Sequence, residues 1–372
     1  MNLSQLRNPV LGKQLLKRIT QRAKSVVAAL GRKPVFMEVC GTHTTAISRC
    51  GLHSLLESLV ELRSGPGCPV CVTSTADLDQ MLALARQPNV MLATFGDLLR
   101  VPGSHSSLEQ EKAQGARIEV LYSPWEALTL AERHRDQQVV LIGVGFETTA
   151  PLVALCVAEA QQRKLTNFSI LSLHKTVPPV LHALLSDPEL CLDGLLLPGH
   201  VCAVTGRQPY DFIASQYGKS AVVTGFEPLD ILGAMDHLLE MLQSKEPRVI
   251  NGYTRVVREV GNPRAQEMIQ QYFATGTASW RGFGDIPDSG LYLRAAYKNY
   301  DAWTSLASSD ASTVVKTGCH CGDVLKGKLM PTGCALFAQA CTPAWPQGPC
   351  MVSSEGACAA YYQYERASKR KG

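Results

Sequence analysis

The sequence predicts an α/β protein with two doubly wound parallel-sheet units and a loop-rich, cysteine-bearing C-terminal region. Up to residue 245, short and nearly continuous apolar runs alternate with helical patterns, which is typical of parallel strands covered on both faces. After residue 245 this alternation stops, and glycine, proline and cysteine become more frequent. The 372 residues are also too many for one small core.

Composition narrows the class of protein. Hydrophobic residues make up 45% and charged residues 18%, so wholesale disorder is excluded, and a net charge of +4 gives no reason to expect nucleic acid. The first residues lack the apolar core of a signal peptide, and no apolar run approaches the roughly 20 residues of a membrane span. We therefore expect a cytoplasmic protein without a membrane partner, in which most of the 13 cysteines stay reduced and clusters of them indicate metal or redox chemistry rather than disulfides.

The first expected element is a basic amphipathic helix over residues 11–30. Its apolar residues recur at helical spacing, at Leu15, Leu16, Ile19, Ala23 and Val26. We expect this face to pack against the rest of the protein.

Eight strands are expected after this helix. They cover 34–39, 59–63, 90–95, 117–122, 139–144, 168–173, 194–197 and 220–224. Helical patterns lie between them, near 44–57, 74–86, 124–134, 149–163, 178–186, 209–217 and 228–243.

Eight such strands could close one barrel, but two four-stranded units divided near residue 135 are preferred. The first would cover 31–135 and the second 136–245. A short internal echo favours this division, since Cys-Gly-Thr-His-Thr-Thr-Ala at 40–46 resembles Gly-Phe-Glu-Thr-Thr-Ala at 145–150. Each segment follows a strand and opens a helix.

The remainder, residues 246–372, contains one further helical pattern at 263–273, with Pro263 placed for its first turn. The rest reads as long loops. Such loops need something besides a hydrophobic core to fix them, and a metal cluster would do so.

Four cysteines in this region are the main candidates for metal ligands. Cys321, Cys334, Cys341 and Cys358 follow the spacing Cys-x12-Cys-x6-Cys-x16-Cys, which matches neither the paired knuckles of zinc ribbons nor the compact run of bacterial ferredoxins. A cubane iron–sulfur cluster, a structural zinc and unligated thiols all remain open on spacing alone. The choice of four is open as well, because Cys319 or Cys350 could substitute.

A second cysteine motif lies upstream, where Cys68 and Cys71 form a Cys-x2-Cys within a Gly/Pro turn that follows a strand. A thiol beside a helix N-terminus has a lowered pKa, and such a pair can cycle between dithiol and disulfide. The competing interpretation is half of a zinc site, but no second Cys-x2-Cys is present to complete it. Redox activity is therefore preferred.

Cys40 and His43 follow the first expected strand at its carboxyl end, the edge of an open α/β sheet where ligands bind. A thiolate there, with an imidazole three residues later, suits soft iron or copper, or a nucleophile. A buried cysteine with a capping histidine is equally compatible. Polar residues at other expected strand ends suggest a polar rim along this edge: Asp97, Glu147, His174, His200 and Glu227.

Taken together, these motifs resemble the HypD family, the maturation factors of nickel–iron hydrogenases. The resemblance spans nearly the whole chain. It rests on the motifs MEVCGTHT (37–44), GPGCPVC (65–71), TFGDLLRVPG (94–103), GFETT (145–149), PGHV (198–201), GFEPLD (225–230), GNP (261–263), WRG (280–282) and MVSSEGACAA (351–360).

The resemblance implies two Rossmann-like α/β domains and a third, iron–sulfur domain over 246–372, joined by the N-terminal helix within residues 1–30. The matching positions imply that Cys321, Cys334, Cys341 and Cys358 ligate a [4Fe–4S] cluster. Cys319 and Cys350 then look like extras, since the family motif needs no cysteine there.

The resemblance also implies a scaffold with redox activity rather than a conventional turnover enzyme. Cys40 would bind the iron of the Fe(CN)2CO group of hydrogenase, opposite a cysteine of the chaperone HypC, with His43 beside it. Cys68 and Cys71 would be the redox pair between cluster and iron. The cyanide would come from HypE, supplied by HypF, and the chain would act as a monomer within a hetero-complex.

Two other functions compete with this hypothesis. One is an iron–sulfur-dependent thiol–disulfide oxidoreductase that acts on a protein substrate. The other is a zinc-stabilised interaction module without redox chemistry.

Overall fold

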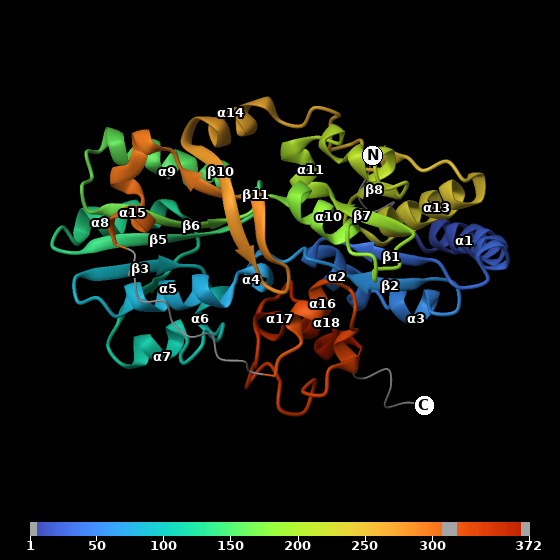
Figure 1. Cartoon of the computed structure of the whole chain (residues 1–372), viewed down its shortest axis with the longest axis horizontal. Coiled ribbons are helices and arrows are strands. Elements are labelled where there is room, and N and C mark those ends of the chain that lie inside the picture. The colour runs from blue at the N-terminus through green and yellow to red at the C-terminus, as the bar shows by residue number, and fades with distance from the viewer. Residues whose placement is uncertain (1–5, 307–317, 366–372) are drawn as a thin grey trace.

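The structure is a computed structural model that describes residues 6–306 and 318–365. It contains two parallel β-sheets, and a cysteine-rich segment at the C-terminal end of the chain lies against the region where they meet (Figure 1). The predicted α/β class with two parallel-sheet units is therefore confirmed. The strands of the described residues form separate sheets rather than one closed barrel.

The first sheet has five parallel strands in the order β2-β1-β7-β8-β9. These strands are β1 (Val35–Glu38), β2 (Glu61–Ser64), β7 (Gly194–Pro198), β8 (Ser220–Thr224) and β9 (Val249–Asn251). The helices of this unit are α1 (Pro9–Leu30), α2 (Gly41–Arg49), α3 (Leu52–Leu56), α11 (Gly199–Thr205), η2 (Gln208–Tyr210), α12 (Phe212–Ser215) and α13 (Pro228–Ser244).

The second sheet has four parallel strands in the order β4-β3-β5-β6. They are β3 (Val90–Thr94), β4 (Arg117–Val120), β5 (Gln138–Gly145) and β6 (Phe168–His174). The helices of this unit are α5 (Thr75–Ala85), α6 (Gly96–Leu99), α7 (Leu108–Ala113), α8 (Trp125–Arg133) and α9 (Ala150–Gln162), and α14 (Pro263–Tyr272) packs on α9.

Both sheets are buried on both faces, which explains their nearly continuous apolar strands. In β7, Leu195 belongs to a core cluster that extends across both units, whereas its neighbour Leu196 belongs to a cluster under α1 and α13. In β5, Val140 and Leu141 are divided in the same way between the shared cluster and one under α8 and α9. Alternate residues of each strand thus point to opposite, equally apolar faces.

The sheet membership differs from the predicted division near residue 135. After β2 the chain leaves the first sheet through α4 (Pro69–Val72) and builds all four strands of the second. It then returns through α10 (Val177–Leu185) to add β7 beside β1. Apolar runs reveal where strands occur, but they carry no information on which strands pair, so the interleaving was not predicted.

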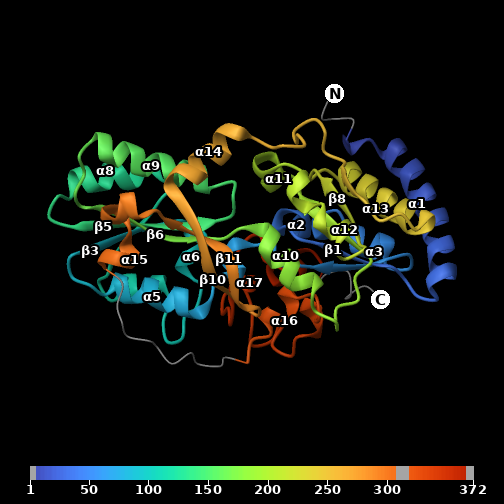
Figure 2. The ribbon, with the colours of Figure 1, turned by 45° about the horizontal axis from the view of Figure 1, so that its top comes forward.

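A long hairpin replaces part of the predicted loops after residue 245. Strand β10 (Phe273–Trp280) pairs antiparallel with β11 (Gly284–Leu293), and η3 (Ala295–Tyr300) and α15 (Ala302–Ser305) follow. The hairpin runs along the boundary between the two sheets (Figure 2). Trp280 is buried at its end and donates its indole N–H to Ser289 Oγ at 2.8 Å.

The cysteine-rich segment keeps the predicted loop-rich character. Its short elements are α16 (Cys321–Leu325), η4 (Pro331–Gly333), α17 (Pro349–Val352) and α18 (Ala357–Tyr364). Helices α16 and α17 pack against α4, and α18 packs against α2. The segment therefore contacts the two stretches of chain that carry Cys40 and the Cys-x2-Cys motif.

The N-terminal helix forms as predicted but packs in a different place. Ile19, Ala23 and Val26 are buried against α13, and the exposed Arg18 and the partly exposed Arg22 pair with the buried carboxylate of Asp236. This helix completes the first sheet unit, whereas it was expected to join the distal cysteine region. Residues 1–5 of the expected segment lie outside the described residues.

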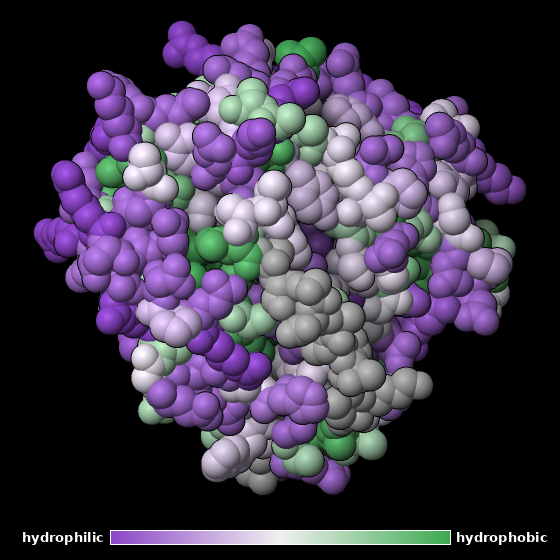
Figure 3. Space-filling view, turned by 60° about the vertical axis from the view of Figure 1, so that its left-hand side comes forward, coloured by the Kyte–Doolittle hydropathy of each residue, from purple (hydrophilic) through white to green (hydrophobic). Residues whose placement is uncertain are grey.

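The described chain contains no helix with both the length and the apolarity to cross a membrane. The face shown in Figure 3 carries mainly hydrophilic side chains, and its hydrophobic residues form separate small groups.

Candidate functional site

Cys40 sits where three segments of the chain meet. It follows β1 and is the residue before α2, and its side chain is buried. The backbone N–H of Gly41 donates to the carbonyl of Gly67 at 3.1 Å. On the other side, a Cβ on Gly41 would lie 2.4 Å from the carbonyl oxygen of Glu355, so only glycine allows this approach.

Burial controls the ionisation of this thiol. It raises the pKa of Cys40 to about 12, although the backbone N–H groups of His43 and Thr42 oppose this effect. The neighbouring carboxyl of Glu38 accepts the backbone N–H of Cys40 at 3.0 Å, and burial raises the pKa of Glu38 to about 8. The thiol is therefore protonated at neutral pH.

A histidine ring contacts this sulfur, that of His200 in the first turn of α11. Its Nδ1 lies 3.8 Å from Cys40 Sγ, and burial lowers the pKa of His200 to about 4, so the ring is neutral at pH 7. His43, the predicted site residue, instead donates a hydrogen bond from Nε2 to the carbonyl of Gly225 at 2.9 Å, and its ring packs on Phe226. The ring of His200 packs against Phe226 as well, so Phe226 contacts both histidine rings.

A cleft of about 370 Å³ opens in front of this group. It is lined by His200 and Phe226 from the first sheet unit, by residues 144–146 and 148–149 at the carboxyl end of β5, and by Glu355. The strand ends of both sheets thus converge on one cleft, in the position that open α/β sheets use for ligands. Of the five polar residues expected to form a rim along this edge, only His200 lines the cleft.

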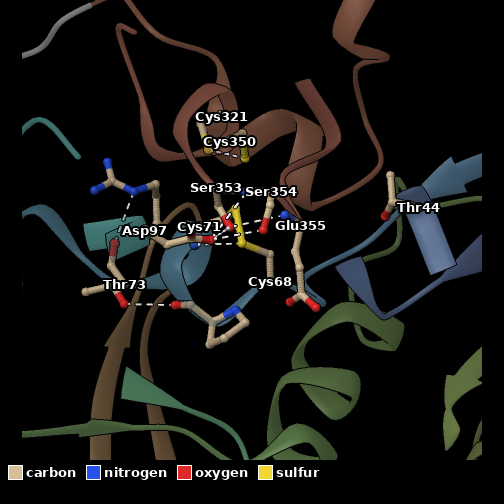
Figure 4. Close-up of a disulfide and its surroundings, with 12 residues drawn as sticks. Thr44, Cys68, Cys71, Thr73, Asp97, Cys321, Cys350, Ser353, Ser354 and Glu355 are labelled. Atoms are coloured by element: carbon tan, nitrogen blue, oxygen red, sulfur yellow. Dashed lines mark hydrogen bonds between the residues drawn. A yellow bond between two sulfur atoms is a disulfide. The ribbon is translucent and has the colours of Figure 1, made fainter. Parts of the chain in front are cut away.

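Cys68 and Cys71 form a disulfide across α4. Both residues are buried, and the backbone N–H of Cys71 donates to Cys68 Sγ at 3.1 Å (Figure 4). Gly67 precedes this helix, and a Cβ there would lie 2.1 Å from the backbone nitrogen of Cys40. The disulfide and Cys40 therefore lie on directly contacting loops.

The distal cysteines gather in the cysteine-rich segment. Burial raises the pKa of Cys358, and the nearby thiols of Cys321, Cys319, Cys341 and Cys334 raise it further. A sixth cysteine joins them, since Cys350 Sγ lies 2.7 Å from Cys321 Sγ. The structure thus brings all four predicted ligands together, along with both cysteines that spacing could not exclude.

The donor atoms gathered in this segment are all cysteine sulfurs. Within residues 6–306 and 318–365, no three His, Cys, Asp or Glu side chains converge closely enough to hold one metal ion. A structural zinc needs four donors around one point, whereas a [4Fe–4S] cluster takes one cysteine sulfur per iron and so spreads its ligands apart. The sulfur-only chemistry of the site also suits iron–sulfur ligation.

The hairpin connects α4 to the cysteine-rich segment. Arg281 donates from Nε to the carbonyl of Thr73 at 3.1 Å and from Nη1 to Thr75 Oγ1 at 3.0 Å. Next to it, Gly282 packs directly on Gly322, where a Cβ would approach the neighbouring backbone to 2.6 Å. The disulfide helix is therefore fixed between the Cys40 loop on one side and the distal cysteines on the other.

Comparison with known proteins identifies the family. The family model for HypD, described as the hydrogenase formation hypA family, matches residues 11–365. The chain belongs to the HypD family.

Its relatives in this family cover almost the full chain. A hydrogenase maturation factor HypD of Rhodobacter capsulatus is 46% identical over 367 residues, covering 97% of each chain. HypD of Escherichia coli is 41% identical over 98% of each chain, and HypD of Azotobacter vinelandii is 42% identical over 98% of this chain and 97% of its own.

Two residues at the site of this HypD-family chain were not among the predicted site residues. His200 was noted only as one of several polar strand ends, and Glu355 only as part of a longer motif. Glu355 Oε1 accepts a hydrogen bond from Thr42 Oγ1 at 2.7 Å and lines the cleft. A useful signal was available for both, because each lies within a motif that carries the family resemblance.

Proposed function

We propose that this HypD-family chain acts in hydrogenase maturation, as its relatives are named, and that it is the scaffold and redox centre on which the Fe(CN)2CO group is assembled. It would work in complex with a HypC-type chaperone and receive cyanide from HypE, which HypF supplies. The carrying observation is the position of α4, whose disulfide lies between the Cys40 cleft and the distal cysteines.

Cys40 is the proposed ligand of the iron that is being assembled. A soft thiolate suits an iron that carries cyanide and carbonyl ligands, and metal binding would remove the proton that burial otherwise keeps on this thiol. His200 Nδ1 is placed to contact the same sulfur. The adjoining cleft of about 370 Å³ leaves room for the small diatomic ligands and for a cysteine of the chaperone.

Cys321, Cys334, Cys341 and Cys358 are the proposed ligands of a [4Fe–4S] cluster. When bound, this cluster supplies single electrons. Opening the Cys68–Cys71 disulfide takes two electrons and two protons, and yields two thiols. The backbone N–H of Cys71, which already points at Cys68 Sγ, would stabilise a thiolate at Cys68 as the bond opens.

Burial of the disulfide disfavours the competing oxidoreductase function. The residues Cys68 and Cys71 are 3% and 0% exposed, so a thiol of a protein substrate has no direct approach to either sulfur. Electrons exchanged with a buried neighbour inside the same chain need no such approach.

The test is anaerobic co-purification with the HypC-type chaperone, followed by metal and sulfide analysis and infrared spectroscopy. We expect infrared bands of iron-bound cyanide and carbon monoxide, and more iron than sulfide, because the iron that carries these ligands adds to the equal iron and sulfide of the cluster. Cys40→Ala should keep the iron–sulfur content and lose the infrared bands. Cys50→Ala is the matched control, because Cys50 lies at the other end of α2 and is exposed. Zinc in place of iron, or bands that persist in Cys40→Ala, would contradict the proposal.

A further inference from the structure

The tip of the β10–β11 hairpin holds the chain directly after the disulfide helix α4. The backbone N–H of Arg281 donates to the carbonyl of Val72 at 2.8 Å. Its side chain donates from Nε to the carbonyl of Thr73 at 3.1 Å and from Nη1 to Thr75 Oγ1 at 3.0 Å. Arg281 therefore binds nearly every residue of the short stretch that follows Cys71.

The residues bound by Arg281 are in turn bonded back across α4. The N–H of Val72 donates to the carbonyl of Cys68 at 3.1 Å, and Thr73 Oγ1 donates to the carbonyl of Pro69 at 2.9 Å (Figure 4). On the opposite side, the residue that precedes Cys68 lies against the Cys40 loop. Both ends of the disulfide turn are therefore fixed by contacts with other parts of the chain.

The hairpin tip can support α4 because it is itself buried and bonded. Trp280 is 1% exposed, and its backbone pairs with the chain after α4 in an antiparallel bridge. Lys175 donates from Nζ to the carbonyl of Ser279 at 2.9 Å, which joins the tip to the end of β6. Gly282 packs on Gly322 of the cysteine-rich segment. A movement of α4 would therefore have to disturb several buried contacts.

We propose that Arg281 is a positioning residue for the Cys68–Cys71 pair, which keeps the two sulfurs close together after their bond opens and thereby lowers the reduction potential of the disulfide. This inference rests on the proposed redox role of the pair. Opening the bond takes two electrons and two protons and yields two thiols. The thiols gain conformational freedom only as far as α4 can change its shape, and the hydrogen bonds of Arg281 limit that change. Because less entropy is lost when the bond closes again, the equilibrium favours the disulfide.

A lower reduction potential makes the dithiol a stronger reductant. This direction suits the proposed function, because such a pair gives up its electrons readily to the group bound at Cys40. The charge of Arg281 acts the other way, since a nearby cation stabilises a thiolate and with it the reduced pair. The hydrogen bonds and the charge of Arg281 therefore predict opposite shifts when the side chain is removed.

The test measures the equilibrium between disulfide and dithiol in mixtures of reduced and oxidised dithiothreitol, with the full chain under anaerobic conditions. The reduced dithiothreitol supplies both electrons and both protons. Equilibrium is approached from the oxidised and from the reduced protein, and free thiols are then trapped by alkylation. The tryptic peptide of residues 64–86 contains Cys68 and Cys71 and no other cysteine, so its mass reports on this pair alone.

Arg281→Ala should shift the equilibrium about tenfold towards the dithiol, the size of effect that one hydrogen bond from a charged donor produces. Arg281→Lys keeps the charge but loses the fork of two donors, so it should shift the equilibrium in the same direction by less. Thr75→Val removes one acceptor with little change of shape and should give about a threefold shift. The control is Arg294→Ala, because Arg294 makes a similar bond, from Nε to the carbonyl of Gln270, at the far end of the hairpin.

The outcomes separate this inference from the proposed function. An unchanged equilibrium in Arg281→Ala, together with a lower urea midpoint, would show a role in stability alone and overturn the inference. A shift towards the disulfide would overturn it as well, because the charge would then outweigh the hydrogen bonds. If Arg281→Ala does not fold, an unchanged equilibrium in Thr75→Val has the same meaning. A wild-type pair that stays oxidised in every mixture would remove the proposed redox role and this inference with it.

Discussion

The backbone of Cys40 touches Gly67 so closely that a methyl group on Gly67 would lie 2.1 Å from the Cys40 nitrogen and 2.2 Å from its Cα. Cys40 begins α2, and Gly67 immediately precedes the disulfide cysteine Cys68. No side chain separates the two loops at this point. Cys40 and the disulfide therefore lie on loops that are joined by one close backbone contact.

Substitution of Gly67 tests this contact. In Gly67→Ala the two loops must separate, and overpacking of this kind costs about 1–3 kcal/mol of unfolding free energy. We expect a lower urea midpoint, and weaker infrared bands of iron-bound cyanide in co-purified protein. Gly233→Ala in α13 is the control, because a Cβ there meets open space. Equal stability of Gly67→Ala and wild type would contradict the close approach.

The ion pairs of Asp236 provide a second test. This carboxylate is buried and accepts from both Arg18 and Arg22 at 2.7 and 3.0 Å. Replacing both arginines by alanine leaves a buried charge without its partners, which costs about 3–5 kcal/mol. Asp236→Asn removes the charge itself, so this variant should lose less unfolding free energy, measured by urea unfolding, than the double-arginine variant. A double-arginine variant as stable as wild type would show that α1 does not depend on these pairs.

The carboxyl of Glu38 predicts a pH dependence of stability. Burial raises the pKa of Glu38 from about 4.5 to about 8, so the folded chain holds this proton more tightly than the unfolded chain. The stabilisation is complete below pH 4.5, is lost as the pH rises through 8, and does not change further above that. Glu38→Gln should flatten this part of the profile, measured by urea unfolding from pH 5 to 9. Parallel profiles of the variant and wild type would contradict the raised pKa.

Asp97 connects the second sheet unit to the turn that carries Glu355. Its Oδ2 accepts from Ser353 Oγ, from the N–H of Ser354 and from Ser354 Oγ, at 3.1 to 3.3 Å. Asp97→Ala should weaken this turn by about 1 kcal/mol and speed amide hydrogen exchange locally within residues 353–356. Asp97→Asn keeps an oxygen acceptor and should have a smaller effect. Unchanged exchange in Asp97→Ala would show that the turn is held by other contacts.

All eight strands expected from the sequence occur within two residues of their predicted positions. The inner strands are buried on both faces and leave nearly continuous apolar runs, whereas the edge strands β2 and β4 alternate between buried and more exposed residues. The hairpin β10–β11 was missed for the opposite reason. Its segments FATGTASW and GDIPDSGLYL are rich in small and polar residues, and they are ordered by contacts with distant parts such as Thr73 and Lys175. The local sequence pattern of a segment does not show which distant residues it will contact.

The candidate site shows the same limit. The cysteine motifs could be found from the sequence because clustered cysteines in a reducing compartment indicate metal or redox chemistry more often than structural disulfides. The choice between His43 and His200 could not be made, since both follow a strand end. The choice depends on the pairing of β7 with β1, which lie about 160 residues apart in the sequence. It also depends on the carbonyl of Gly225, which accepts the hydrogen bond of His43.

The interleaved sheets also determine when the site can form during synthesis of the chain. Strands β1 and β2 emerge first, but the other neighbour of β1 is β7, so the sheet that carries Cys40 cannot be completed until β9 ends at Asn251. Until then the thiols of Cys40, Cys68 and Cys71 belong to an unfinished core on the growing chain. The last cysteines, Cys350 and Cys358, are synthesised near the end of the chain. The proposed electron source is therefore the last part of the site to be made.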